Sequence, residues 1–317
     1  MLNFLKNLLT PRSLEQAQSS LCSGAEYYKN KSYENAIKKY QEAIQIFQDH
    51  FGKKHPVVVK LHYFIGLCYS NQGKSAEAIK HFEKCLETKN KLMGRSNTTI
   101  QEEDQILFST SSDESERNAP IRMLTLYIII GREYYAQRKY SEALKNYRKA
   151  LEYCLKNCGE DDPLVATIYN NIALVHREQG KYREALDVYM KDLEISKRHY
   201  GEYHPCVAVT YNNIGLVYNS QQKYEEALQN FEKSLQIYLA EYGENHPSVA
   251  TAYNNIGGVY LGQEKYDLAF KNFRKGLEIR KLYYGNSHPE IVISLSNIGD
   301  VLFQSEQYKE ALDFYLK

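Results

Sequence analysis

The stretch VAVTYNNIGLVYNSQQKYEEALQNFEKSLQIYLAEYG, residues 207–243, contains the pattern that decides the fold of this 317-residue chain. A small residue is followed at fixed spacing by two aromatics, an alanine and a third aromatic, here Gly215, Tyr218, Tyr224, Ala227 and Phe231. With few substitutions the pattern occurs seven times, starting at Gly24, Gly66, Gly131, Ala173, Gly215, Gly257 and Gly299. Successive copies start 42 residues apart, except that 65 residues separate Gly66 from Gly131. A fixed period of this length is typical of a stacked repeat array, which usually presents a long surface to another chain.

Each copy predicts two antiparallel helices. In the quoted copy, apolar or small residues recur at helical spacing from Val207 to Tyr218, and a second stripe begins at Tyr224. A glycine ends the second helix and a proline four residues later begins the next copy, as at Gly201 and Pro205. We expect the small residue of each copy to face the alanine of the pattern, so that the two helices approach closely. The predicted fold class is therefore all-α, a right-handed superhelical solenoid of about seven helical hairpins.

The Gly-x-x-Tyr and Ala-x-x-x-Phe/Tyr spacing resembles the tetratricopeptide repeat, with tyrosines at 127, 169, 211 and 253 where that family often has tryptophan. The 42-residue period and the stretches GEYHPCVAVTYNNIG (201–215) and GENHPSVATAYNNIG (243–257) are similar to the kinesin-light-chain subclass. The resemblance covers about residues 14–317 and implies a repeat scaffold that binds peptides with the first helix of each pair. True kinesin light chains carry a long coiled coil before the repeats, whereas about 13 residues precede them here. We therefore expect no direct assembly with a kinesin heavy chain.

The period divides the chain into four parts. These are an N-terminal segment (1–13), repeats 1 and 2 (14–94), an acidic, serine-rich insert (95–119), and repeats 3 to 7 with the last one incomplete (120–317). The insert is expected to be a solvated loop. The alternative is that its apolar triplet, Ile106-Leu107-Phe108, occupies the binding groove as an internal pseudo-ligand.

Composition argues against several classes of function. The 40 basic and 39 acidic side chains are mixed throughout, whereas sequence-independent nucleic-acid binding needs a concentrated basic face. No apolar run approaches the roughly 20 residues of a membrane span, and the N-terminus lacks the features of a secretory signal. The six cysteines are expected to be reduced thiols, so the chain is expected to be cytoplasmic, with association with the cytoskeleton or a cilium as an option.

No arrangement of residues in the sequence predicts catalysis or a cofactor. Cys154 and Cys158 lie one turn apart and could form half of a metal site, but no His or Cys pair follows nearby. Four histidines each precede a proline and are interpreted as helix-entry residues, at positions 55, 204, 246 and 288. We therefore expect no enzyme activity, no metal and no cofactor.

The candidate peptide-binding residues lie on the first helix of each pair, on the face opposite the packed tyrosines. They are a row of second asparagines, Asn171, Asn213, Asn255 and Asn297, and the first asparagines beside three of them, Asn170, Asn212 and Asn254. Asparagine is a mediocre helix former, and its amide can both donate to and accept from an extended peptide backbone. The alternative is that these amides bond to neighbouring turns and lock one repeat to the next.

The earlier repeats present a different chemistry at the same face. The basic residues there are Lys60, Arg132 and Arg177, and the apolar ones include Phe64, Ile128 and Ile129. A ligand with a bulky apolar residue flanked by acids would match this part, which is similar to the motifs that the kinesin-light-chain subclass prefers. Alternatively, the insert covers these apolar residues.

These observations predict a non-catalytic scaffold or adaptor that binds extended peptide segments in a concave groove. The expected partners are proteins or peptides, without nucleic acid, membrane insertion or a small-molecule substrate. One alternative is a permanent structural subunit of a large cytoskeletal or ciliary assembly, because the incomplete last repeat is expected to expose Leu312, Tyr315 and Leu316. The other is the regulatory repeat region of a longer protein.

Overall fold

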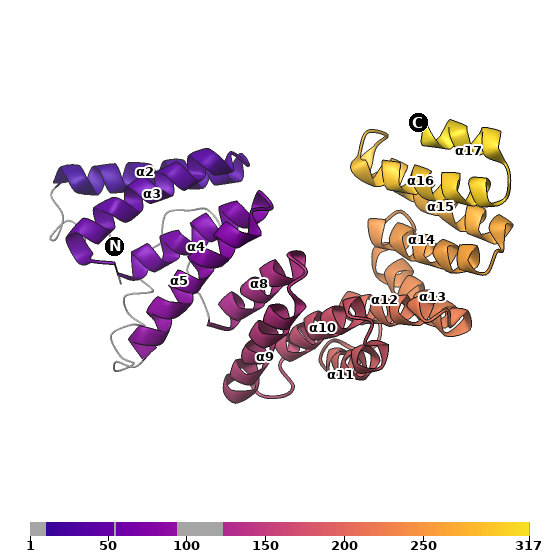
Figure 1. The fold of residues 1–317 in the computed structure, drawn as a ribbon, viewed down its shortest axis with the longest axis horizontal. Helices are drawn as coiled ribbons and strands as arrows, with labels where there is room; N and C mark the ends of the chain where they lie inside the picture. Colours follow the sequence, from indigo (N-terminus) through magenta and orange to yellow (C-terminus); the bar gives the residue numbers. More distant parts are fainter. Residues whose placement is uncertain (1–10, 54, 94–122, 317) are drawn as a thin grey trace. The chain divides into compact units, whose positions relative to one another are not determined.

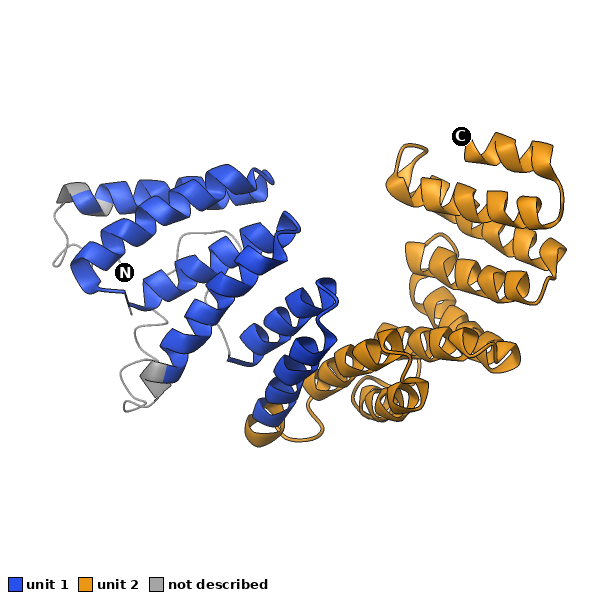
Figure 2. Ribbon diagram, viewed as in Figure 1, with its two compact units in different colours: residues 1–153 blue, residues 154–317 orange. Residues whose placement is uncertain are grey.

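The computed structural model describes residues 11–53, 55–93 and 123–316, and these residues form helices and turns without any strand (Figure 1). The chain divides into two compact units, residues 1–153 and 154–317 (Figure 2). The helices of unit 1 are α2 (Pro11–Lys29), α3 (Tyr33–Phe51), α4 (Pro56–Asn71), α5 (Ser75–Met93), α8 (Met123–Ala136) and the greater part of α9 (Tyr140–Asn157). Those of unit 2 are α10 (Pro163–Glu178), α11 (Tyr182–Tyr200), α12 (Pro205–Ser220), α13 (Tyr224–Tyr242), α14 (Pro247–Gly262), α15 (Tyr266–Tyr284), α16 (Pro289–Gln304) and α17 (Tyr308–Tyr315).

Within each unit, consecutive helices pack in pairs, and successive pairs pack on one another. In unit 2, α10 packs on α11, α12 on α13, α14 on α15 and α16 on α17, while α11, α13 and α15 each contact the first helix of the following pair. Unit 1 repeats this order from α2 to α5 and continues from α5 to α8. We call the first helix of a pair the A helix and the second the B helix. The predicted all-α array of helical hairpins is confirmed, whereas the proposed insert and its apolar triplet lie outside the described residues.

Histidine and proline together start four of the A helices, whereas α10 begins with Asp162 and a proline. His55, His204, His246 and His288 are N-caps whose Nδ1 accepts the backbone N–H two residues later, and a proline occupies the first turn of each helix. Each imidazole also stacks on the aromatic residue near the end of the preceding B helix, as Tyr284 does on His288 with ring centroids 4.0 Å apart. The interpretation of these histidines as helix-entry residues is therefore confirmed.

The small residue of the pattern faces a ring and not the alanine that we expected. A Cβ added to Gly215 would lie 2.7 Å from Cε1 of Phe231, the last aromatic of the same copy. Gly24, Gly66, Gly131, Gly257 and Gly299 stand against the equivalent ring in the same way. The alanines of the pattern are instead buried within the hairpins, and Ala227, for example, is fully buried. Glycine suits this position because the ring comes so close to the A-helix backbone that an added Cβ would meet it.

Candidate functional site

The row of asparagines lies on the A helices of unit 2, at one position of α10, α12, α14 and α16. The second asparagines Asn171, Asn255 and Asn297 are half-buried, whereas Asn213 is 9% exposed. Because α10 contacts α12 and α12 contacts α14, the side chains of Asn171, Asn213 and Asn255 lie on neighbouring helices, and α16, which carries Asn297, packs on α15. The structure therefore brings the predicted residues of unit 2 onto one series of adjacent helix faces.

Amide–amide hydrogen bonds connect successive A helices along this row. Asn213 Nδ2 donates to Oδ1 of Asn170 at 3.4 Å, and Asn255 Nδ2 donates to Oδ1 of Asn212 at 2.6 Å. In both pairs the second asparagine of one repeat bonds to the first asparagine of the repeat before. The amides thus do lock repeat to repeat, which was the alternative reading of the row. One bond uses only part of the hydrogen-bonding capacity of an amide, which has two N–H donors and a carbonyl acceptor.

A buried carboxylate that the sequence reasoning missed holds the first of these pairs. Asp192 on α11 is 3% exposed and accepts hydrogen bonds from Asn170 Nδ2 at 2.9 Å, Thr210 Oγ1 at 2.8 Å and Ser196 Oγ at 3.0 Å. Burial raises the pKa of Asp192, and the three hydrogen bonds lower it in part. The equivalent residues of the next two B helices are Ser234 and Gly276, so this carboxylate does not recur in repeats 5 and 6.

The first asparagine of repeat 6 has a different environment. Asn254 is 9% exposed, and its Oδ1 would lie 2.3 Å from a Cβ added to Gly276 on α15. The missing side chain of Gly276 therefore makes room for the Asn254 amide. Asn170 and Asn254 thus both contact the B helix of their own hairpin. We therefore expect them to hold the second asparagines in place and not to contact a ligand themselves.

The predicted basic residues divide between the two units. Arg177 belongs to unit 2, is largely buried, and donates to Glu178 Oε1 from Nε at 3.3 Å and from Nη2 at 2.8 Å. Lys60 and Arg132 belong to unit 1, where Lys60 is half-buried on α4 and Arg132 is exposed on α8. Arg132 lies beside Glu133, a second buried carboxylate that the sequence reasoning did not select.

Unit 1 has apolar residues at the positions of the asparagine pairs. Phe64 stacks on Tyr40 with centroids 5.6 Å apart, and Tyr63 lies 5.8 Å from the ring of Phe82. Ile129 is buried in the cluster that includes Phe82, and Ile128 beside it is half-buried. These side chains pack within the described part of unit 1, so their apolar character has a structural cause.

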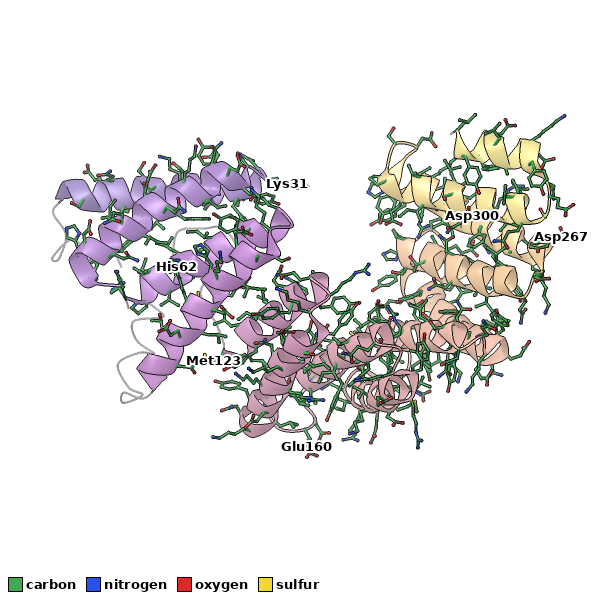
Figure 3. The ribbon with its side chains drawn as sticks, viewed as in Figure 1. Lys31, His62, Met123, Glu160, Asp267 and Asp300 are labelled. Atoms are coloured by element: carbon green, nitrogen blue, oxygen red, sulfur yellow. The ribbon has the colours of Figure 1, made fainter. Side chains whose placement is uncertain are left out.

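Two histidines of unit 1 form a further pair that the sequence reasoning missed. His62 on α4 (Figure 3) and His81 on α5 approach with their Nδ1 atoms 3.1 Å apart. Burial, with smaller contributions from nearby charge that include Lys84, lowers the pKa of each imidazole to about 4. His62 occupies the position at which repeats 3 to 6 have tyrosine, such as Tyr127. This departure from the repeat pattern is the feature of the sequence that could have identified the pair. Over the part of the chain that the structure describes, no cluster of three or more His, Cys, Asp or Glu residues could hold a metal ion.

A family model described as the tetratricopeptide repeat matches residues 15–91, 122–198, 165–240, 206–281 and 248–317. Among solved structures, BtubC (BKLC) from P. vanneervenii is 21% identical over 87% of this chain and 94% of its own, with a TM-score of 0.58. The nearly identical repeats of a Podosopora anserina protein described as a kinesin light chain are 16% identical over 61% of this chain and 93% of their own, with a TM-score of 0.52. A STAND ATPase with a tetratricopeptide repeat sensor from Pyrococcus horikoshii matches 95% of this chain with 41% of its own, at 15% identity and a TM-score of 0.64. No match was found among curated proteins.

These similarities show the fold and the repeat type, and kinesin-light-chain-like repeat proteins are among the similar structures. Repeats of this type are generally non-enzymatic scaffolds, and the fold supports a role in protein interaction. Among the helices that the structure describes, none has the length and apolar character that crossing a membrane requires.

Proposed function

Because the chain belongs to the tetratricopeptide repeat family, we propose that it is a non-catalytic adaptor that holds an extended segment of a partner protein against its A helices. The observation that carries this proposal is the row of half-buried amides on neighbouring A helices in unit 2, chiefly Asn171, Asn255 and Asn297. An extended peptide presents one N–H and one C=O per residue, and amide side chains can bond to both. We place this role in the cytoplasm, with the cytoskeleton or a cilium as the alternative location.

The hydrogen bonds between repeats favour this role because they fix amides before a ligand arrives. Asn255 is held by its bond to Asn212, and its carbonyl oxygen and second N–H are left for other partners. A side chain that is already ordered loses less entropy on binding, which raises affinity without any new contact. The buried Asn213 contributes by holding Asn170 in place, so its substitution is expected to act indirectly.

The basic residues indicate the chemistry of the partner segment. Within unit 2, Arg177 lies on the same helix as Asn171. A carboxylate of the segment bound to the amide row is expected to pair with Arg177, and acidic groups are expected to pair separately with Lys60 and Arg132 on the A helices of unit 1. We therefore propose an acidic or acid-flanked segment as the class of ligand.

The test is to select peptides from a random library with the intact chain and to measure their affinity by fluorescence anisotropy. We expect dissociation constants in the micromolar range. Asn171→Ala and Asn255→Ala should each weaken binding about 5- to 10-fold, which corresponds to roughly one hydrogen bond of 1 kcal/mol or slightly more. Asn230→Ala is the matched control, because Asn230 lies on a B helix and bonds only to its own helix at Glu226 O. Unchanged affinity in an Asn171/Asn255/Asn297 triple alanine variant with an intact helical spectrum would refute the proposal.

The exposed side chains of the last hairpin favour a second candidate function, a permanent structural subunit of a larger assembly. Leu312 is 56% exposed, Tyr315 46% and Leu316 77%, as the sequence predicted, and Val292 and Phe303 on α16 are exposed as well. In repeats 4 to 6 the residues equivalent to Val292 are the buried alanines Ala166, Ala208 and Ala250. Partners lost by a Leu312→Lys/Leu316→Lys variant but retained by the asparagine variants would favour this candidate.

A further inference from the structure

Repeat 2 departs from the pattern at two neighbouring positions, where serine replaces large side chains. Ser75 occupies a position that holds tyrosine in the six other repeats, at 33, 140, 182, 224, 266 and 308. Ser70 occupies a position that holds Tyr28, Tyr135, Arg177, Asn219, Leu261 or Phe303. In repeats 1, 3 and 7 both positions are aromatic and the rings meet, with centroids 5.8, 6.0 and 5.4 Å apart. Repeat 2 therefore lacks a pair of side chains that other repeats place together.

The missing side chains leave a cleft of about 650 Å³ within unit 1. It lies between the turn that joins α4 to α5 and the C-terminal half of α8. Ser70, Ser75 and Glu133 all line it, with the small residues Ala76 and Ala136 and the charged side chains of Lys74 and Arg132 also on its wall. The departures from the repeat pattern are thus gathered in one place.

The third departure is a buried carboxylate. Glu133 is 4% exposed, and Ser70 Oγ donates to its Oε1 at 2.6 Å. The equivalent residue is an exposed glutamate in repeat 1 (Glu26) and a buried Cys68, Val175, Val217, Val259 or Val301 in the remaining repeats. The ion pairs found across the described residues include none to Glu133. A buried carboxylate without a cation is costly, so valine would suit this position better if it served packing alone.

We propose that this cleft binds an alkyl guanidinium or alkyl ammonium group, the group that arginine and lysine side chains carry. The cation would donate to the carboxylate oxygens of Glu133, and its alkyl stem would lie against Ala76 and Ala136. A charge-assisted bond to a desolvated carboxylate is among the stronger polar interactions available to a protein. Glu133 becomes a specificity-determining residue of a site that is separate from the asparagine row of unit 2.

The rim of the cleft restricts which cations fit. Arg132 and Lys74 carry positive charge, and Lys74 Nζ lies 3.9 Å from Glu34 Oε1 of repeat 1, an exposed and screened pair. A ligand with a second cation near the rim would be repelled. We therefore expect a blocked arginine, such as an arginine within a peptide, to bind more tightly than a free diamine-like cation such as agmatine.

Saturation-transfer NMR with the intact chain tests the proposal without any peptide partner, so its outcome does not depend on the function proposed above. The probe is N-acetyl-arginine methylamide, and its neutral isostere N-acetyl-citrulline methylamide is the control. We expect saturable binding of the arginine probe at about millimolar concentration, as for other small fragments, and at least about tenfold weaker binding of the citrulline probe. Tighter binding of agmatine than of the blocked arginine would assign the site to free cations and not to peptides, while the cation site itself would stand.

Two variants that are expected to fold as well as the parent chain separate loss of binding from loss of structure. Glu133→Val introduces the residue of repeats 4 to 7, and Ser75→Tyr introduces the residue of the six other repeats. Both changes restore the pattern, so we expect melting temperatures equal to or above that of the parent chain and loss of the arginine-probe signal. Equal binding of the arginine and citrulline probes, no saturable binding, or binding retained by both variants would overturn the proposal.

Discussion

At the scale of single residues, a ring lies against a glycine in six of the seven hairpins. A Cβ at Gly215 would clash with the Phe231 ring, whereas a Cβ at Gly258 on α14 would meet nothing within 4 Å. Repeat 4 has Ala173 at the equivalent position above the fully buried Tyr189, so the backbone can accommodate one methyl group when the spacing adjusts. Substitution of Gly215 by alanine therefore combines the cost of close packing with the gain in helix propensity, whereas substitution of Gly258 measures the gain in helix propensity alone.

We predict that Gly215→Ala and Gly258→Ala change stability in opposite directions. Overpacking typically costs 1–3 kcal/mol, while alanine in a helix gains about 0.5–1 kcal/mol over glycine. Gly215→Ala should therefore destabilise the chain by about 1 kcal/mol, and Gly258→Ala should stabilise it by about 0.5 kcal/mol. Chemical denaturation followed by circular dichroism measures both values, and a stabilising Gly215→Ala would show that the ring does not restrict this position.

The Asp192 network supplies a prediction about pH. Because burial raises the pKa of Asp192 above its ordinary value, the folded chain binds this proton more readily than the unfolded chain. The carboxylate therefore costs stability increasingly as the pH rises through the folded-state pKa. Asn at this position keeps hydrogen-bonding groups and carries no charge.

We expect Asp192→Asn to match or exceed the melting temperature of the parent chain at pH 8, and the difference to shrink as the pH falls. Melting curves of both proteins at several pH values between 8 and 4 measure this difference, in which the titration of all other groups cancels. A large loss of stability at pH 8 would mean that the charge itself, through its three hydrogen bonds, stabilises the junction between repeats 4 and 5.

At the scale of elements, the sequence predicted the hairpins well because every signal is present several times. His-Pro helix starts, glycine stops and the aromatic spacing recur with the same period, so errors in one copy are corrected by the others. Side-chain partners were less predictable because they depend on residues that do not recur. Asp192 draws Asn170 into a hydrogen bond, and Gly276 makes room for Asn254, although both asparagines occupy the same helix position. The sequence left both readings of the row open, and the distances between the amides show that at least two of them bond across repeats.

The α4–α5 hairpin should be the acid-sensitive element of unit 1. His62 and His81 have pKa values lowered to about 4, chiefly by burial, so the unfolded chain takes up their protons first as the pH falls. Their contribution to stability is complete above about pH 6.5 and is lost between that value and about pH 4. The short Nδ1–Nδ1 contact adds to the effect because two imidazolium ions cannot both donate across it.

His62→Tyr introduces the residue of repeats 3 to 6 and removes one of the two titrating groups. We predict that the melting temperature of this variant falls less steeply between pH 6.5 and 4 than that of the parent chain. His199→Tyr, at an exposed position of α11, is the control and should leave the steepness unchanged. Equal slopes for His62→Tyr and the parent would contradict the assignment of acid sensitivity to this hairpin.

At the scale of the whole molecule, the two units carry different surface chemistry. Unit 2 has the amide row on consecutive A helices and exposed apolar side chains on its last hairpin. Unit 1 has apolar residues at the amide positions and the cleft that contains Glu133. Repeat arrays have no single core, so local departures from the pattern can create binding sites without destabilising distant repeats. The cleft that contains Glu133 therefore occurs where repeat 2 departs from the pattern. The asparagine row occurs where repeats 4 to 7 follow the pattern regularly.

The central claim is that a partner segment lies against the A helices, and photo-crosslinking measures this most directly. A library-selected peptide that carries a benzophenone group is irradiated in complex with the intact chain, and the attached residues are identified by mass spectrometry. The account predicts attachment within α10, α12, α14 and α16, near Asn171, Asn255 and Asn297, and loss of attachment in the triple alanine variant. Attachment to the B helices α11, α13 and α15, or to α17 alone, would contradict it.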